Sequence, residues 1–462
     1  MPDLTRPELK LPESAGTAFT LDYATSRKIQ NAVDAAFDEQ LSFISELVKE
    51  PSLRGAESSA QDLMFSAMQA RGLGMDRWPI DSPALRDHIG YGPATVSYEN
   101  VDNVVGTYSP PTHRGRSLIL NGHVDVVPTG PQETWTRSPW DAKIIDGWMY
   151  GRGSADMKAG LAANLFAFDA VRSAGFVPTA PIYIQSVVEE ECTGNGSLAA
   201  LLRGYRADAI IIPEPEENML VRANVGVIWF KIRISGKPTH PREMRSGYNA
   251  IDAAYIVMAR LRELEESWNA DRQSHRYFED LEHPINFNFG MIAGGDWPSS
   301  VPAWCEFHVR AALYPGTSAE VAWQQITKCL ELSAANGISH VHAERSGFYS
   351  EGYVLEEGTD AESVLAGAHR QAFGADLHSF TTPGYLDGRV FVLYGDTPTM
   401  VYGPVSEAIH GFDERVCIES VRKITKSIAL FIAEWCGLEP ADRCPLPRKT
   451  AEATNSITEI TK

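Results

Sequence analysis

The chain has 462 residues, of which 44% are hydrophobic and 22% charged, the composition of a globular protein with room for two or three domains. Its 41 basic and 60 acidic residues give a net charge of −19, which disfavours nucleic acid and anionic membranes as partners. The six cysteines show no CxxC spacing, so neither a disulfide framework nor a cysteine zinc site is predicted. Because the sequence shows no apolar signal-peptide core and no long apolar run, we expect a cytoplasmic protein.

The first part of the chain alternates helices and strands. Apolar residues at helical spacing predict helices over about 25–49 and about 60–71, and a strand is expected near 101–108. SLILNG at 117–122 has the length and composition of a strand that is buried on both faces. This order of elements is typical of an α/β fold.

Polar residues stand where the next buried strands end. His123 and Asp125 come directly after SLILNG, and three glutamates at 189–191 follow PIYIQSVV. Between them, Asp156 precedes an amphipathic helix. Because open α/β sheets place sites at the carboxyl ends of strands, we expect these side chains to meet. Carboxylates packed this closely repel one another unless a cation compensates, so the pattern predicts a metal centre.

Simpler interpretations of these motifs exist. A His-x-Asp pair taken alone is weak evidence for a site, and a glutamate triplet taken alone is usually a solvated turn. It is their joint occurrence, with Asp156 between them, that favours a metal. GNGSLA at 194–199 satisfies the loose dinucleotide-binding pattern and follows a strand. The three preceding glutamates would repel a pyrophosphate, so no nucleotide site is predicted there.

The pattern changes near residue 224. VGVIWFKIRIS at 225–235 alternates apolar and polar residues, as a strand with one solvated face does. A GKPTHP turn follows, and then come a helix at about 249–266, strands near 287–292 and 303–313, and a helix from about 317. This order predicts a small α+β domain inserted at 224–346.

The α/β character returns after residue 350. We expect a helix at about 360–373, strands near 390–393 and 399–401, and a final helix at about 418–435. His410 lies in a loop after the last of these strands, with Glu407 and Glu414 nearby. The predicted parts are 1–223 and 347–440 for the main domain, 224–346 for the insertion and 441–462 for a polar tail.

Six phrases occur in an order that resembles the M20 metallopeptidase and amidohydrolase family, which includes acetylornithine deacetylase, succinyl-diaminopimelate desuccinylase, aminoacylase and carboxypeptidase G. They are NGHVDVVP, GRGSADMKAG, EEECTG, IIPEP, the GKPTH turn and YGPVSEAIHGFDE. The resemblance implies an α/β catalytic domain, a mixed sheet flanked by helices, with an inserted smaller α+β dimerisation or lid domain. It also implies a homodimer.

The resemblance further implies two divalent metal ions per chain. His123 and Glu214 would hold one ion, Glu191 and His410 the other, and Asp156 would bridge both. Two histidines with several carboxylates suit zinc, although cobalt or manganese would bind the same set.

Other residues would complete the catalytic set. Asp125 would orient His123, and the family often has a cis peptide after the bridging aspartate, here Asp156–Met157. Bound metal ions acidify a water molecule, and Glu190 would take its proton during attack on an amide carbonyl and deliver that proton to the leaving amine.

Four further residues match family positions. His240, in the GKPTH turn, matches a histidine that reaches across a dimer interface to polarise the scissile carbonyl; without the resemblance it would be a surface residue between two prolines. Arg310 matches an arginine that holds a substrate carboxylate, and its alternative is an exposed strand arginine. Gly384 and Asp387, in PGYLDGR, match a substrate-facing loop. His308 and the SSVP segment depart from the family pattern, which leaves recognition of the acyl or carboxylate end open.

The predicted function is that of a dinuclear metal amidohydrolase, which cleaves the amide of a small-molecule N-acyl amino acid or related N-acyl amine and is most similar to acetylornithine deacetylase. A metallo-dipeptidase or carboxypeptidase, or an N-formyl aminopyrimidine deformylase, would use the same scaffold, and GGDWPSSVP and EEECTGNG favour such branches. A non-catalytic binding protein is a third hypothesis. It requires a missing base or ligand, and none is missing from the set.

Overall fold

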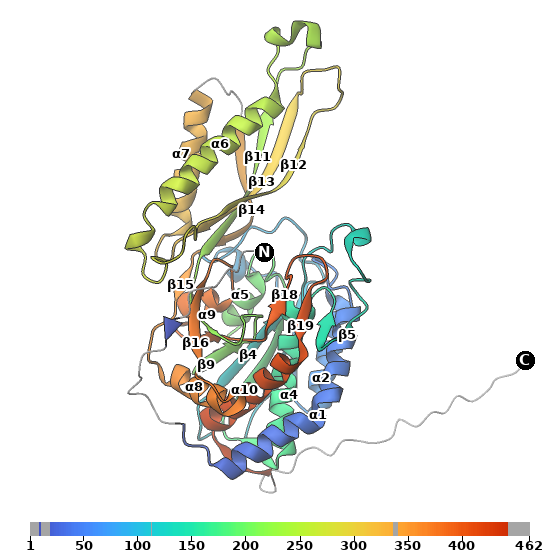
Figure 1. Ribbon diagram of the computed structural model, residues 1–462, viewed down its shortest axis with the longest axis vertical. Helices are drawn as coiled ribbons and strands as arrows, with labels where there is room; N and C mark the ends of the chain where they lie inside the picture. Colours follow the sequence, from blue (N-terminus) through green and yellow to red (C-terminus); the bar gives the residue numbers. More distant parts are fainter. Residues whose placement is uncertain (1–8, 11–18, 112, 336–340, 442–462) are drawn as a thin grey trace, which may run out of the picture.

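The computed structural model describes residues 9–10, 19–111, 113–335 and 341–441, so the predicted tail lies outside the described residues from 442 onward. The chain forms a larger and a smaller part (Figure 1), each with its own hydrophobic core. The helices are α1 (Tyr23–Lys49), α2 (Ser58–Ala70), α3 (Pro83–Arg86), α4 (Ala159–Ser173), α5 (Asn195–Leu202), α6 (Ala250–Asn269), α7 (Ala319–Ala335), α8 (Asp360–Phe373), α9 (Gly388–Gly395) and α10 (Ile418–Cys436).

The larger part is built on a six-stranded mixed sheet in the order β17-β9-β4-β8-β3-β2. Its strands are β2 (Gly74–Pro79), β3 (Asp102–Tyr108), β4 (Leu118–His123), β8 (Ile182–Val187), β9 (Ala209–Ile212) and β17 (Thr399–Val401). Strands β17, β9, β4 and β8 are parallel. Their carboxyl ends therefore meet at one edge, where the predicted polar residues follow β4, β8 and β9.

Helices α1, α4 and α10 pack together against this sheet, so the first and last long helices of the chain are neighbours (Figure 1). The sequence prediction was wrong at residues 390–393, which belong to helix α9 and not to a strand. The segment GRVFVLYG holds a short apolar run, and such a run cannot be assigned to a strand or to a buried helix by periodicity.

The smaller part is an antiparallel sheet in the order β12-β13-β11-β14, with α6 and α7 on one face (Figure 1). Its strands are β11 (Gly226–Ser235), β12 (Phe287–Gly294), β13 (Trp304–Leu313) and β14 (Val341–Ser350). The element order is the predicted one, and β14 extends beyond the predicted limit at residue 346. Buried and exposed residues alternate in the outer half of β11, as expected for a sheet with one solvated face.

Shorter strands complete the larger part. They are β1 (Leu9–Lys10), β10 (Leu220–Asn224), β15 (Tyr353–Val354) and β16 (His378–Thr382) in one sheet, β5 (Lys143–Ile145), β6 (Trp148–Tyr150), β18 (Ser406–Glu407) and β19 (Arg415–Cys417) in another, and the pair β7 (Phe176–Pro178) and β20 (Leu438–Pro440). Because β19 pairs with β6, the loop that carries His410 lies beside the segment that leads to Asp156. Within the described residues, no helix combines the length and apolar character that a membrane span needs.

Candidate metal centre

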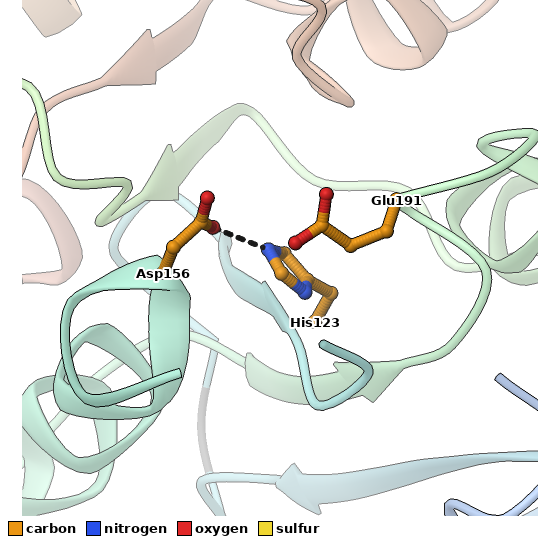
Figure 2. Close-up of side chains that lie close together, drawn as sticks. All are labelled: His123, Asp156 and Glu191. Atoms are coloured by element: carbon orange, nitrogen blue, oxygen red, sulfur yellow. Dashed lines mark hydrogen bonds and ion pairs between the residues drawn. The ribbon is translucent and has the colours of Figure 1, made fainter. Parts of the chain in front are cut away.

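His123 is the last residue of β4 and is buried, with 1% of its surface exposed. Its Nδ1 lies 2.9 Å from the backbone carbonyl oxygen of Asp125, and its Nε2 lies 3.1 Å from Oδ1 of Asp156. Figure 2 shows the carboxylates of Asp156 and Glu191 beside the ring. The backbone contact at Nδ1 leaves Nε2 facing the carboxylates, which is the orientation that a metal-binding imidazole needs.

Asp156 lies between two imidazoles. It belongs to the short turn Ser154–Lys158 before α4, and its peptide bond to Met157 is cis, as the family resemblance implied. While Oδ1 faces His123, Oδ2 lies 3.3 Å from Nε2 of His410. One carboxylate thus contacts histidines that are far apart in the sequence, which is the geometry expected of a bridging ligand.

The remaining predicted ligands surround this core. Nε2 of His410 lies 3.1 Å from Oε2 of Glu191, and Nε2 of His123 lies 3.7 Å from Oε1 of Glu214 and 3.8 Å from Oε2 of Glu190. One possible ligand atom from each of His123, Asp156 and Glu191 falls within 4.8 Å of the others. The structure therefore brings together all five predicted ligands and the predicted base.

The electrostatics of this cluster fit a bound cation. Oε1 of Glu214 is buried without a hydrogen-bond partner, and burial raises the pKa of this carboxyl to about 7. The negative charge of Glu191, followed by contacts with Asp156, raises the pKa of His410 to about 11. Closely packed carboxylates thus attract positive charge, and their oxygen atoms with two imidazole nitrogens form a donor set that suits zinc.

Asp125 contacts the His123 ring with its backbone and approaches it with its carboxylate, and the orienting role of that carboxylate stays a prediction. Its backbone carbonyl contacts the ring, whereas its carboxylate Oδ1 lies 3.6 Å from Nδ1. The carboxylate also accepts hydrogen bonds from the backbone N–H groups of Glu190 at 3.4 Å and Glu191 at 3.1 Å. Asp125 therefore holds the loop that carries two of the acidic residues.

Glu189, the first glutamate of the triplet, makes hydrogen bonds to residues outside the metal cluster. Glu189 is buried and pairs with Arg54 through two hydrogen bonds, while Tyr98 and Thr193 donate to its Oε2 at 2.7 and 3.0 Å. Sequence reasoning missed Arg54 and Tyr98, because the sequence contains no local signal that joins them to residue 189. This network anchors the loop one residue before Glu190.

His240 lies apart from the cluster in the same chain. It is exposed and follows β11, a strand of 10 residues that spans about 33 Å. Strand β11 belongs to the smaller part (Figure 1). Arg310, on β13, is half-buried, and its Nη2 donates to the carbonyl oxygen of Pro383 at 3.3 Å. This contact places the guanidinium beside the loop that carries Gly384 and Asp387.

Hydrogen bonds within the predicted substrate-facing loop hold both Gly384 and Asp387. Asp387 is 1% exposed, its Oδ1 accepts a hydrogen bond from the hydroxyl of Tyr385 at 2.9 Å, and its Oδ2 has no partner. Gly384 donates its backbone N–H to the hydroxyl of Thr382 at 3.2 Å. Asp387 is therefore held inside the loop, while Gly384 belongs to a local turn.

Comparison with known proteins gives the family. The model of Peptidase family M20/M25/M40 matches residues 119–434, a range that includes the whole cluster. N-formyl-4-amino-5-aminomethyl-2-methylpyrimidine deformylase of Halalkalibacterium halodurans is 27% identical over 439 residues, which cover 88% of this chain and 97% of that protein. Succinyl-diaminopimelate desuccinylase of Pseudomonas fluorescens is 27% identical over 409 residues, which cover 85% and 96%.

A solved structure supports the fold. The dipeptidase Dug1p from Saccharomyces cerevisiae matches with a TM-score of 0.72 at 14% identity, over 89% of this chain and 98% of that one. The family implies a divalent metal, typically zinc, and the cluster supplies suitable donors. The chain therefore belongs to Peptidase family M20/M25/M40 and is a metal-dependent hydrolase of carbon–nitrogen bonds.

Proposed function

We propose that the protein is a deacylase that hydrolyses the amide bond of a small N-acylated amino acid or related N-acyl amine. The observation that carries this proposal is the position of Asp156 between His123 and His410. Two divalent ions, zinc in the first place, would be held by the five ligands His123, Glu214, Asp156, Glu191 and His410. The relatives described above are a deformylase and a desuccinylase, and both names denote removal of an acyl group.

The bound ions would supply an acidified water molecule and a polarised carbonyl. We assign the proton transfer to Glu190, because its carboxylate lies 3.8 Å from Nε2 of His123 and is not one of the five proposed ligands. Burial raises its pKa well above the usual value for a glutamate, which suits a base that must later return the proton to the leaving amine. The carboxylate of Asp125 keeps Glu190 in place, because it accepts a hydrogen bond from the backbone N–H of Glu190.

Arg310 supports an amino-acid substrate. Burial lowers its pKa to about 10, and no acidic side chain of the described residues pairs with it. A substrate carboxylate would provide the negative charge that pairs with this guanidinium, and it could accept two parallel hydrogen bonds from it. An N-acyl amino acid carries such a carboxylate.

An N-formyl aminopyrimidine is the second candidate substrate. It is favoured by the match to the deformylase, which covers 97% of that protein. A substrate of this kind would leave Arg310 without an anionic partner. Turnover by an Arg310→Met variant separates the candidates, since loss of activity is expected only for a substrate with a carboxylate.

The smaller part would act as an inserted dimerisation domain. His240 lies beyond the far end of β11, so a partner chain is the source from which this histidine would reach the scissile carbonyl. Its role would be to donate a hydrogen bond to the developing oxyanion, an interaction that contributes roughly 3–4 kcal/mol in comparable sites. The active unit that we propose is therefore a homodimer.

The proposal is tested by metal analysis of dialysed protein and by a panel of N-acetyl, N-formyl, N-succinyl and dipeptide substrates. Glu190→Gln is expected to keep its metal and to lose about 10²–10⁴-fold in kcat, the usual contribution of general-base catalysis. The control is Glu407→Gln, an exposed carboxylate that pairs with Arg415. Unchanged turnover by Glu190→Gln, or turnover of dipeptides alone, would contradict the proposal.

A further inference from the structure

Arg152 and Glu414 form a buried ion pair beneath the metal centre. Their side chains are 1% and 0% exposed, and Nη1 of Arg152 donates to Oε2 of Glu414. Arg152 follows β6, and Glu414 precedes β19, so the pair joins two strands that are neighbours in one sheet. Two charges removed from water cost several kcal/mol, and a pair of this kind often contributes little net stability.

Glu414 holds the peptide that carries the bridging carboxylate. Its Oε1 accepts hydrogen bonds from the backbone N–H groups of Ala155 at 3.0 Å and Asp156 at 3.1 Å. These two contacts orient the turn from which the side chain of Asp156 emerges. A carboxylate can accept from the backbone with one oxygen and from an arginine with the other, which an amide or a shorter acid cannot do from the same place.

Arg152 extends the same network to two more loops. Its Nη2 donates to the carbonyl oxygen of Gly411 at 3.0 Å and to that of Pro128 at 3.4 Å. Gly411 follows His410 directly, and Pro128 lies in the loop that begins after His123. The planar guanidinium can reach these acceptors together because its donors have a fixed, forked arrangement.

We propose that Arg152 and Glu414 are positioning residues that set Asp156 between His123 and His410. This inference rests on the proposed metal centre, since it gives the pair a role in metal affinity. Two segments that carry predicted ligands, and the loop that follows His123, hydrogen-bond to this one pair, so its loss would change their relative positions. Partners in this outer layer typically alter metal affinity by about 10–100-fold.

The chain offers a matched control. Arg222 and Glu362 form another buried pair, 1% and 4% exposed, with 2.5 Å between Nη2 and Oε1. This pair joins β10 to α8, and Arg222 also donates to the backbone of Leu355. Glu362→Gln therefore removes one buried charge from a similar ion pair, and in the part of the chain that the structure describes this pair does not contact the loops that carry the predicted ligands.

The experiment is a calorimetric titration of metal-free protein with zinc. Glu414→Gln, Glu414→Asp and Arg152→Lys are each expected to bind zinc about 10–100-fold more weakly than wild type. Glu362→Gln is expected to bind as wild type does while it loses thermal stability. Circular dichroism establishes that each variant is folded, and Arg152→Lys carries the test if the Glu414 variants do not fold.

The outcomes separate the possible explanations. Wild-type affinity in folded Glu414→Asp, which keeps the charge but has one methylene less, would show that only charge matters and would overturn the positioning role. An equal loss in Glu362→Gln would overturn it as well, because a general structural effect would then suffice. Failure of the wild-type protein to bind zinc would overturn the proposed metal centre and the role of the pair together.

Discussion

Oδ2 of Asp125 accepts a hydrogen bond from the backbone N–H of Glu191 at 3.1 Å. Asp125, which lies after β4, thereby fixes Glu191, which lies after β8. The two residues meet because β4 and β8 are parallel neighbours and their carboxyl ends lie side by side. The backbone carbonyl of Asp125 meanwhile holds the ring of His123. Asp125 thus aligns His123, at the end of β4, with Glu191, in the loop that follows β8.

The first prediction concerns Asp125→Asn. The N–H groups of Glu190 and Glu191 bond to different oxygens of Asp125, and in an amide one of these positions becomes an NH₂ group that cannot accept, so we expect about a 10–100-fold loss of kcat. His123 should keep its orientation, because a backbone carbonyl holds it. The measurement is kcat at saturating zinc, together with the histidine signals in the NMR spectrum. A variant with full activity would show that the carboxylate is dispensable.

The second prediction concerns the stability of the loop at 189–191. Glu189→Gln leaves Arg54 without its charged partner, and because Arg54 is only 19% exposed we expect a loss of about 1–3 kcal/mol in the free energy of unfolding. Urea denaturation measures this change. The matched variant is Asp81→Asn in the exposed pair with Arg86, for which we expect less than about 1 kcal/mol. Equal losses in the two variants would contradict the prediction.

The third prediction concerns pH and His369. This side chain is 4% exposed and stacks on Phe373, and burial lowers its pKa to about 4, against about 6.5 in an unfolded chain. Between these values the unfolded state binds more protons, so stability is fully present above pH 6.5 and is lost as the pH falls toward 4.

Comparison with His369→Gln isolates this contribution. Between pH 7 and pH 5 the wild-type protein is expected to lose on the order of 2 kcal/mol more than the variant, which has no titrating group at that position. Urea unfolding at the two pH values provides the measurement. All other ionisable groups are the same in the two proteins. An equal loss of unfolding free energy between pH 7 and pH 5 would therefore refute the lowered pKa of His369.

The fourth prediction concerns the proposed homodimer. Strand β12 is at an edge of its sheet and exposes Met291 and Ile292 at 63% and 56%, while Tyr255 on α6 is 63% exposed. Apolar side chains on an edge strand are a suitable surface for a second copy. Ile292→Lys is expected to shift the protein to monomers in light scattering and to reduce activity, because His240 would lose its partner site.

Val321→Lys serves as the control for this variant. Val321 is 47% exposed on α7, the helix that packs on β11 and β14, and β14 is the edge strand opposite to β12. This variant should remain a dimer with normal activity. A fully active monomer, whether wild type or Ile292→Lys, would remove His240 from the catalytic residues.

Much of the fold could be predicted because its elements have strong periodic signals. The helix at 360–373 and the alternating strand at 225–235 both bury one side, and burial of one side imposes a spacing that a sequence reveals. Residues 388–395 gave no such signal. Their apolar run is short, and in the structure it forms a helix that packs against α5, β15 and β17.

The sequence by itself determined which residues are candidates for the chemistry: His123, Asp156, Glu191, Glu214 and His410 were predicted as ligands from motifs and their order. Only the tertiary structure decided how they are held. Arg54 meets Glu189 across 135 positions, and Arg152 meets Glu414 across 262. Contacts of this range arise from strand order and loop packing, and no periodicity along the chain records them, because each partner is compatible locally with many other environments.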